Sequence, residues 1–137
     1  MNKKVRFVAV SNRLPISIQK MGESWTVRPG TGGLVTALAP VLRNRGGLWI
    51  GWPGDGGGQD LVEIVSSSSK NVGYDLIPVL LDRTEVHDYY NGFSNQIAWP
   101  LFHDLHSYCN FSPHYWYAYI HVNNKFALAI AEQTTEH

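Results

Sequence analysis

The sequence has 137 residues, of which 44% are hydrophobic and 16% are charged, and its 11 basic residues balance its 11 acidic ones. This length supports one domain with a real core, and the composition is that of a folded chain rather than a disordered one. A net charge of zero provides no broad field to attract nucleic acid or an anionic membrane. We therefore expect small-molecule partners, with any phosphate recognised locally, and neither nucleic acid nor membrane.

The cellular compartment is predicted from two negative features. The single cysteine, Cys109, excludes an internal disulfide and fits a reducing compartment. The apolar run Val5–Val10 is interrupted by Arg6 and is too short for a signal peptide, and no apolar stretch approaches the roughly 20 residues that span a bilayer. These features predict a cytoplasmic protein. Cys109 has no identifiable base beside it in the sequence, so we do not expect it to act as a nucleophile.

The chain begins with the pattern of a parallel strand followed by a hairpin. Lys4–Ser11 is a largely apolar, β-branched run, typical of a buried parallel strand that ends at Asn12–Pro15. Ile16–Lys20 and Ser24–Arg28 both alternate and predict a β-hairpin. Ligands of open α/β sheets bind beyond the carboxyl ends of the strands. Arg13 is therefore either a phosphate clamp or an ordinary surface arginine in a loop.

A glycine-rich turn opens the first predicted helix. Gly30, Gly32 and Gly33 fall within four positions, and an apolar helical pattern that contains Pro40 follows directly. Such a turn presents free N–H groups at the positive end of the helix dipole, which is an anion site, and Thr31 could cap it. The alternative is that the glycines serve a tight turn and close packing. The pattern matches neither the P-loop nor the dinucleotide fingerprint, so an unrelated nucleotide-binding domain is disfavoured.

Two further strands are predicted in the middle of the chain. Leu48–Gly54 has the pattern of a buried strand, and Gly73–Leu81 has that of a strand which Pro78 places at an edge or bulge. Between them, Asp55–Asp60 is predicted to be a flexible loop and Ser66–Ser69 a polar connector.

The last third of the chain is predicted to be helical. Asp82–Leu105 forms one helical region, capped by Asp82 or Thr84 with Glu85 in its first turn, and Tyr115–Glu132 forms the last helix. The order of elements predicts a three-layer α/β sheet. Since the last helix has no strand to return to, we expect the chain to be an incomplete part of a larger domain.

Four motifs, in order and at characteristic spacing, resemble the N-terminal part of the trehalose-6-phosphate synthase family of retaining glycosyltransferases, family 20. The motifs are Val10–Pro15, Gly32–Leu38, Gly47–Gly54, and Tyr89–Asn95 with Trp99–His103. The resemblance covers nearly the whole chain and implies a Rossmann-like N-terminal domain of a GT-B type glycosyltransferase. It is less specific for the product, because glucosylglycerol-phosphate synthases and validoxylamine-type pseudo-glycosyltransferases look similar.

The resemblance implies transfer of glucose from UDP-glucose or a related nucleotide-glucose to glucose 6-phosphate, giving trehalose 6-phosphate. Residues 1–137 would then be the partial, acceptor-side domain, and the C-terminal nucleotide-sugar domain would be absent. We therefore expect the chain alone to be inactive and to carry no catalytic residue. The donor acts as co-substrate, no cofactor is implied, and the full-length parent could form a homo-oligomer. The alternative is a stand-alone sugar-phosphate binding or regulatory module.

The resemblance assigns an acceptor pocket to Arg13, Tyr90 and Trp99, with Arg13 on the phosphate. Nine residues separate Tyr90 from Trp99, which on an α-helix is about 900° of rotation and half a turn away from a shared face. A helix break is needed for both to converge, and Gly92 is the expected position. The local pattern around Trp99, which precedes Pro100, also fits a core residue.

The remaining assignments concern the donor side and the sugar. The resemblance places Trp52 against the sugar and Gly33, with Gly32, at the donor diphosphate. Trp49 is assigned to the core. The histidines show no ligand spacing that joins a second cluster, so we predict no metal site.

Overall fold

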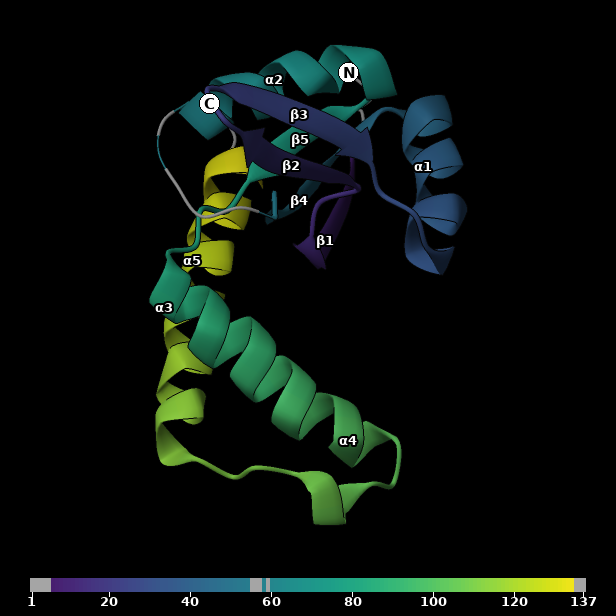
Figure 1. Cartoon of the computed structure of the whole chain (residues 1–137). Helices are drawn as coiled ribbons and strands as arrows, with labels where there is room; N and C mark the ends of the chain where they lie inside the picture. The colour runs from purple at the N-terminus through teal and green to yellow at the C-terminus, as the bar shows by residue number, and fades with distance from the viewer. Residues whose placement is uncertain (1–5, 55–57, 59, 135–137) are drawn as a thin grey trace. The chain divides into compact units, whose positions relative to one another are not determined.

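The computed structural model describes residues 6–54, 58 and 60–134, so most of the predicted flexible loop Asp55–Asp60 lies outside the described residues. The chain divides into two compact units, Met1–Leu80 and Leu81–His137. The first unit contains every strand in the described part of the chain, and the second contains only helices and loops (Figure 1). Each unit is described by itself.

A parallel three-stranded sheet organises the first unit. Strands β1 (Phe7–Arg13), β4 (Gly47–Trp52) and β5 (Asp75–Pro78) lie in the order β1-β4-β5. All six residues of the central β4 are buried, as predicted. Strand β1 is less buried than predicted, because Ala9 is buried whereas Val10, on the other face of the strand, is 46% exposed. Pro78 ends the other outer strand, where a missing N–H costs little, so its predicted edge position is confirmed.

The predicted hairpin and first helix are both present. Strands β2 (Ile16–Met21) and β3 (Ser24–Pro29) pair antiparallel in a separate two-stranded sheet. Helix α1 (Gly33–Arg45) runs through Pro40 and ends before Gly46, whose φ of 68° suits a glycine. The chain therefore reaches α1 from the hairpin through the glycine turn.

The prediction of a connector at Ser66–Ser69 is wrong, because these residues lie inside helix α2 (Asp60–Val72). The serine hydroxyls of Ser67, Ser68 and Ser69 donate to the carbonyl oxygens four residues earlier, at 2.9, 2.8 and 3.3 Å. Helical geometry thus satisfies the polar groups that made the segment look like a loop. Burial of Leu61 and Val65, on the same face as the buried Ser68, holds the helix to the core.

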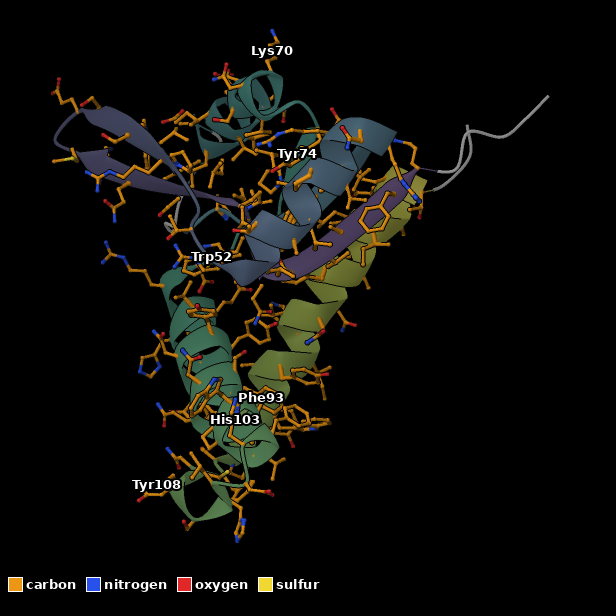
Figure 2. All side chains as sticks on the ribbon, turned by 90° about the vertical axis from the view of Figure 1, so that its right-hand side faces the viewer. Trp52, Lys70, Tyr74, Phe93, His103 and Tyr108 are labelled. Carbon is orange, nitrogen blue, oxygen red and sulfur yellow. The ribbon has the colours of Figure 1, made fainter. Side chains whose placement is uncertain are left out.

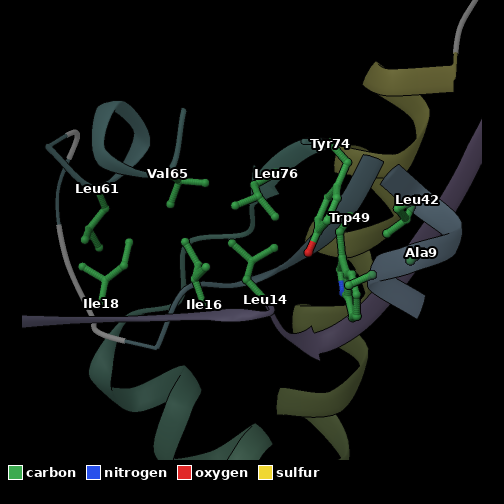
Figure 3. Packing of buried hydrophobic residues seen from close by; sticks show 11 residues of the cluster. Ala9, Leu14, Ile16, Ile18, Leu42, Trp49, Leu61, Val65, Tyr74 and Leu76 are labelled. Carbon is green, nitrogen blue, oxygen red and sulfur yellow. The ribbon is translucent and has the colours of Figure 1, made fainter. Parts of the chain in front are cut away.

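One hydrophobic core joins the sheet, the hairpin and both helices of this unit. Ile16 and Ile18 of β2 lie opposite Leu61 and Val65 of α2, and Trp49 lies beside Tyr74 (Figure 3). The rings of Trp49 and Tyr74 are 6.3 Å apart. Trp49 has no exposed surface, which confirms its assignment to the core.

The second unit consists of α3 (Arg83–Glu85), η1 (Val86–Ala98), α4 (Trp99–Phe102), η2 (His106–Tyr108) and α5 (Pro113–Thr134). The first three form one continuous helical run, as predicted, but η1 is wound as a π-helix. Among the residues that the structure describes, no helix combines the length and apolar character needed to cross a bilayer.

The predicted cap of this helical run is confirmed in detail. Asp82 is the N-cap residue, and its side chain accepts a hydrogen bond from the Glu85 backbone N–H at 2.8 Å. The Glu85 carboxylate in turn accepts from the Asp82 backbone N–H at 2.8 Å. This reciprocal capping box fixes where η1 begins.

We expected Gly92 to break the helix, and this prediction is wrong, because η1 continues through it. Gly92 instead allows close packing. A Cβ on Gly92 would lie 2.6 Å from the ring of Tyr115 on α5. Next to this contact, Phe93 stacks on Tyr119 with ring centroids 4.3 Å apart, and Figure 2 labels Phe93 in this part of the unit. Glycine is therefore required where η1 and α5 pack together.

Candidate functional site

The carboxyl ends of β1 and β4 meet at an irregular pairing. The register shifts between Val10 and Arg13, and Arg13 lies opposite Trp52. The Leu14 N–H donates to the Trp52 carbonyl oxygen at 2.8 Å, which extends the pairing past the end of β1. A Cβ on Gly51 would lie 2.8 Å from the Leu14 nitrogen, so only glycine allows this approach. The bulge places Arg13 at the strand end, as its last residue rather than in a following loop.

The guanidinium of Arg13 is held in a defined position. Its Cζ lies 5.4 Å from the centroid of the Trp52 ring, and its Nη2 donates to Ser17 Oγ at 3.4 Å. On another side, a Cβ on Gly54 would lie 2.8 Å from Nη2. Arg13 is nevertheless exposed, so its charge stays available to a ligand. These contacts favour the phosphate clamp over an unconstrained surface arginine.

A hydrogen-bond relay that begins at the buried Trp49 supports the backbone at Arg13. The Trp49 indole N–H donates to Ser11 Oγ at 2.8 Å, and the Ser11 hydroxyl donates to the Arg13 carbonyl oxygen at 2.6 Å. Sequence reasoning missed the roles of Ser11, Ser17 and Gly54. These roles depend on tertiary contacts that no local sequence pattern reveals, since Trp49 lies 38 positions from its acceptor Ser11.

The structure requires glycine at two of the three positions in the turn, and for two different reasons. Gly30 packs closely, because a Cβ there would lie 2.8 Å from the Pro15 carbonyl oxygen. Gly32 has a φ of 146°, which favours glycine by conformation. At Gly33 a Cβ would meet nothing within 4 Å, so neither packing nor strain requires glycine there. The expected capping role of Thr31 is wrong, since the N-cap is Gly32 and no side chain caps α1.

The start of α1 is exposed and leaves backbone N–H groups without helical acceptors. Gly32 and Gly33 are exposed, and the first α-helical hydrogen bond runs from the Thr36 N–H to the Gly32 carbonyl oxygen at 3.0 Å. The N–H groups before Thr36 have no acceptor inside the helix, and they point along the positive end of its dipole. An approaching phosphate would find these donors and free space beside Gly33.

In the second unit, π winding changes the relation between Tyr90 and Trp99. The Trp99 N–H donates to the Ser94 carbonyl oxygen, five residues earlier. Hydrogen bonds of this i→i+5 type reduce the rotation to roughly 80° per residue, so nine residues make close to two full turns. This winding brings the two positions closer to a shared helix face than α-helical winding would, without a break at Gly92.

Trp99 is not a core residue of the described structure. It is 54% exposed and stacks on His103 with ring centroids 4.1 Å apart, whereas Tyr90 is half-buried. The interpretation of Trp99 as core, which the sequence left open, is thus not supported. An exposed aromatic face suits a sugar ring.

The titratable groups around η1 are engaged in structural contacts. A hydrogen bond from His87 lowers the pKa of Asp88, and His114 lies 3.5 Å from the same carboxylate. Burial raises the pKa of Tyr89, an effect that its hydrogen bond to Ser94 partly offsets.

A second group lies between α3 and α5. The Glu85 carboxylate contacts Lys125 Nζ at 2.6 Å and His121 Nε2 at 3.0 Å. Among the residues that the structure describes, no three His, Cys, Asp or Glu side chains are grouped so as to hold a metal ion.

The first unit is therefore a parallel α/β unit with a positioned arginine at the strand ends and an open helix N-terminus, an arrangement typical of domains that bind phosphorylated ligands. Residues 5–137 match the sequence profile of Glycosyltransferase family 20, and the chain belongs to this family.

Relatives of known identity agree with this assignment. The chain is 41% identical over 131 residues to the trehalose-6-phosphate synthase of Mycolicibacterium vanbaalenii, an alignment that covers 95% of this chain and 27% of that protein. The chain thus spans about a quarter of the length of the curated relatives it matches.

Solved structures support the fold. The synthase of Burkholderia xenovorans in complex with glucose 6-phosphate gives a TM-score of 0.69 at 26% identity, covering 96% of this chain and 26% of that one. The E. coli enzyme bound with UDP-2-fluoro glucose gives the same values. These similarities confirm the predicted α/β fold of a GT-B type glycosyltransferase.

Proposed function

We propose that this chain is the acceptor-binding, N-terminal part of an enzyme that transfers glucose from a nucleotide-glucose donor to glucose 6-phosphate, forming trehalose 6-phosphate. Support comes from the relatives named trehalose-6-phosphate synthase and from the solved relatives that hold glucose 6-phosphate and a UDP-glucose analogue. The observation that carries the proposal is the guanidinium of Arg13, held at a strand end by Trp52 and Ser17.

Arg13 binds the phosphate of the acceptor in this proposal. A guanidinium offers two parallel N–H donors to phosphate oxygens and keeps its charge at every physiological pH. Its contacts with Trp52 and Ser17 reduce the freedom that binding must remove. Trp52, which lies against the guanidinium of Arg13, borders the sugar in this proposal.

The start of α1 binds the diphosphate of the donor. Gly33 leaves space for the phosphate, and the positive φ of Gly32 sets the direction in which the chain enters the helix. Gly33→Ala would fill that space while leaving the helix intact, since alanine favours helix. We expect it to weaken binding of the donor nucleotide to the complete enzyme without lowering stability.

The chain alone is proposed to bind the acceptor but not to catalyse transfer. Departure of the nucleoside diphosphate requires positive groups placed around its developing charge. The part of the relatives that this chain matches is about a quarter of their length. Release of UDP from UDP-glucose in the presence of glucose 6-phosphate measures this directly, and turnover by the chain alone would refute it.

The proposal is tested by titrating glucose 6-phosphate into the chain while following tryptophan fluorescence, because Trp52 lies against Arg13. Arg13→Ala removes a charge-assisted contact of about 1.5–3 kcal/mol and should weaken binding by a factor of roughly 10–150. Arg45→Ala is the matched control, because Arg45 is also exposed but lies in the last turn of α1. Equal affinity of the Arg13→Ala variant and the unchanged chain would contradict the assignment.

Competing acceptors separate the alternatives. Glycerol 3-phosphate shares the phosphate with glucose 6-phosphate but lacks the ring. Preference for glycerol 3-phosphate would indicate a synthase of the glucosylglycerol-phosphate type. Binding of glucose 6-phosphate without transfer, even in the complete protein, would indicate a binding or regulatory module.

A further inference from the structure

The first unit contains a pocket that is separate from Arg13 and from the start of α1. Its volume is about 880 Å³, within the range of small-molecule sites. Its walls come from the hairpin, the residues that follow it, α1, α2 and the segment after α2. Apolar side chains from these elements form most of the lining, and they include Pro15, Ile16, Trp25, Val27, Val35 and Ala39.

Two side chains of the pocket lining can donate hydrogen bonds to a ligand. Tyr74 lines it and is only 6% exposed, yet among the described residues its hydroxyl has no hydrogen-bond partner. Arg43 lines the same pocket, and its Nε donates to the Val72 carbonyl oxygen at 3.0 Å, which fixes the guanidinium. The terminal nitrogens of Arg43 donate to no other described residue.

The two groups act on one another electrostatically. Burial raises the pKa of the Tyr74 hydroxyl, and the positive charge of Arg43 opposes part of that rise. The hydroxyl therefore stays protonated near neutral pH and is available as a donor. A fixed guanidinium and a buried O–H that face one cavity form a donor pair for a carboxylate.

The acidic residues of the pocket do not require a cationic ligand. Asp60 and Glu63 also line it, but both are exposed and lie in the first turn of α2. Negative charge is favourable there because of the helix dipole, and solvent screens it. These exposed carboxylates therefore leave the pocket open to a singly charged anion.

We propose that this pocket binds an amphipathic monocarboxylic acid, with its carboxylate on Arg43 and Tyr74 and its apolar body against Trp25 and the hairpin. The site is independent of the proposed glycosyl transfer. It lies in the Met1–Leu80 unit and involves neither Arg13 nor Gly33. Occupancy would join the hairpin to both helices.

The test uses naphthalene-2-carboxylate as the probe and isothermal titration to measure its affinity for the chain. The neutral 2-naphthalenemethanol and the cationic 2-naphthylmethylamine have the same apolar body. We expect the carboxylate to bind at least 10-fold more tightly than either analogue. Tyr74→Phe and Arg43→Gln should each weaken carboxylate binding by about 10-fold or more and leave the alcohol unchanged, since hydrogen bonds to charged groups have that magnitude.

Controls keep the outcome unambiguous. Circular dichroism verifies that each variant folds. If Tyr74→Phe unfolds the chain, Arg43→Gln by itself tests the proposal. Arg45→Gln, outside the pocket, should bind the probe like the unchanged chain. Equal affinity for the three probes, unchanged affinity in the Arg43→Gln variant, or no binding at millimolar concentration would overturn the proposal. Glucose 6-phosphate should not compete with the probe, and competition would show that the probe occupies the Arg13 site instead.

Discussion

Removal of the Ser11 hydroxyl should destabilise the sheet more than an exposed serine substitution can. The Trp49 side chain has no exposed surface, and its indole N–H donates to Ser11 Oγ at 2.8 Å. Ser11→Ala leaves that buried donor without its acceptor, which costs about 1–3 kcal/mol. It also removes the hydrogen bond from the Ser11 hydroxyl to the Arg13 carbonyl oxygen. Because that bond is exposed, its loss should lower the free energy of unfolding by only about 0.5 kcal/mol. We expect a total loss near 2 kcal/mol.

The substitution pair Ser11→Ala and Trp49→Phe isolates the buried hydrogen bond. Trp49→Phe reduces packing but removes the donor as well, so no N–H is left buried without a partner. The double variant should therefore lose less stability than the sum of the single losses, by about 1 kcal/mol or more. Amide hydrogen exchange of β1 and β4 is the suitable assay, because it reports opening of this sheet regardless of the second unit.

The matched control is Ser24→Ala. Its hydroxyl donates to the Met21 carbonyl oxygen at 3.1 Å in the exposed hairpin turn, so its loss should remain within about 0.5 kcal/mol. Exchange energies that fall equally for Ser11→Ala and Ser24→Ala would refute the reasoning. So would strict additivity of the Ser11 and Trp49 substitutions.

Three further predictions follow from individual contacts. Gly51→Ala places a Cβ 2.8 Å from the Leu14 nitrogen, so it should separate β1 from β4, cost more than about 3 kcal/mol and be detected as lost exchange protection in both strands. Lys125→Met removes the cation from the largely buried Glu85 and should destabilise the second unit by about 1–3 kcal/mol, and adding Glu85→Gln should recover part of that loss in urea unfolding. The pKa of Asp88 is lowered in the folded state, so its contribution is present above the unfolded pKa of about 4 and is lost as pH falls through the folded value. Asp88→Asn should therefore flatten the acid side of the stability profile and leave stability unchanged at a pH below the folded pKa of Asp88.

Local patterns predicted the strands, the hairpin and the cap of α3, because their signals are short in range. The capping box of Asp82 and Glu85 is an example, since both partners lie within one helical turn. The strand-end position of Arg13 followed from a general rule about parallel sheets. The family followed from motifs that the comparison with family 20 confirms.

Errors arose where tertiary context decided between local alternatives. A run of serines looked like a connector, but Leu61 packs on the core and holds the segment as α2. Gly92 looked like a helix break, but the ring of Tyr115 occupies the space where a Cβ would be. In both cases the deciding contact is made by a residue outside the local pattern.

The sequence by itself determined that the chain has an α/β fold and belongs to glycosyltransferase family 20, because hydrophobic periodicity and short motifs encode strands, turns and family. Only the tertiary structure decided which contacts position the candidate site residues. The contacts of Arg13 with Trp52 and Gly54, and the π winding of η1 between Tyr90 and Trp99, depend on the path of the folded backbone. Arg13 lies 39 positions from Trp52 and 41 from Gly54 in the sequence, so these residues meet only when β1 pairs with β4. A local sequence pattern carries no information about contacts at such separations.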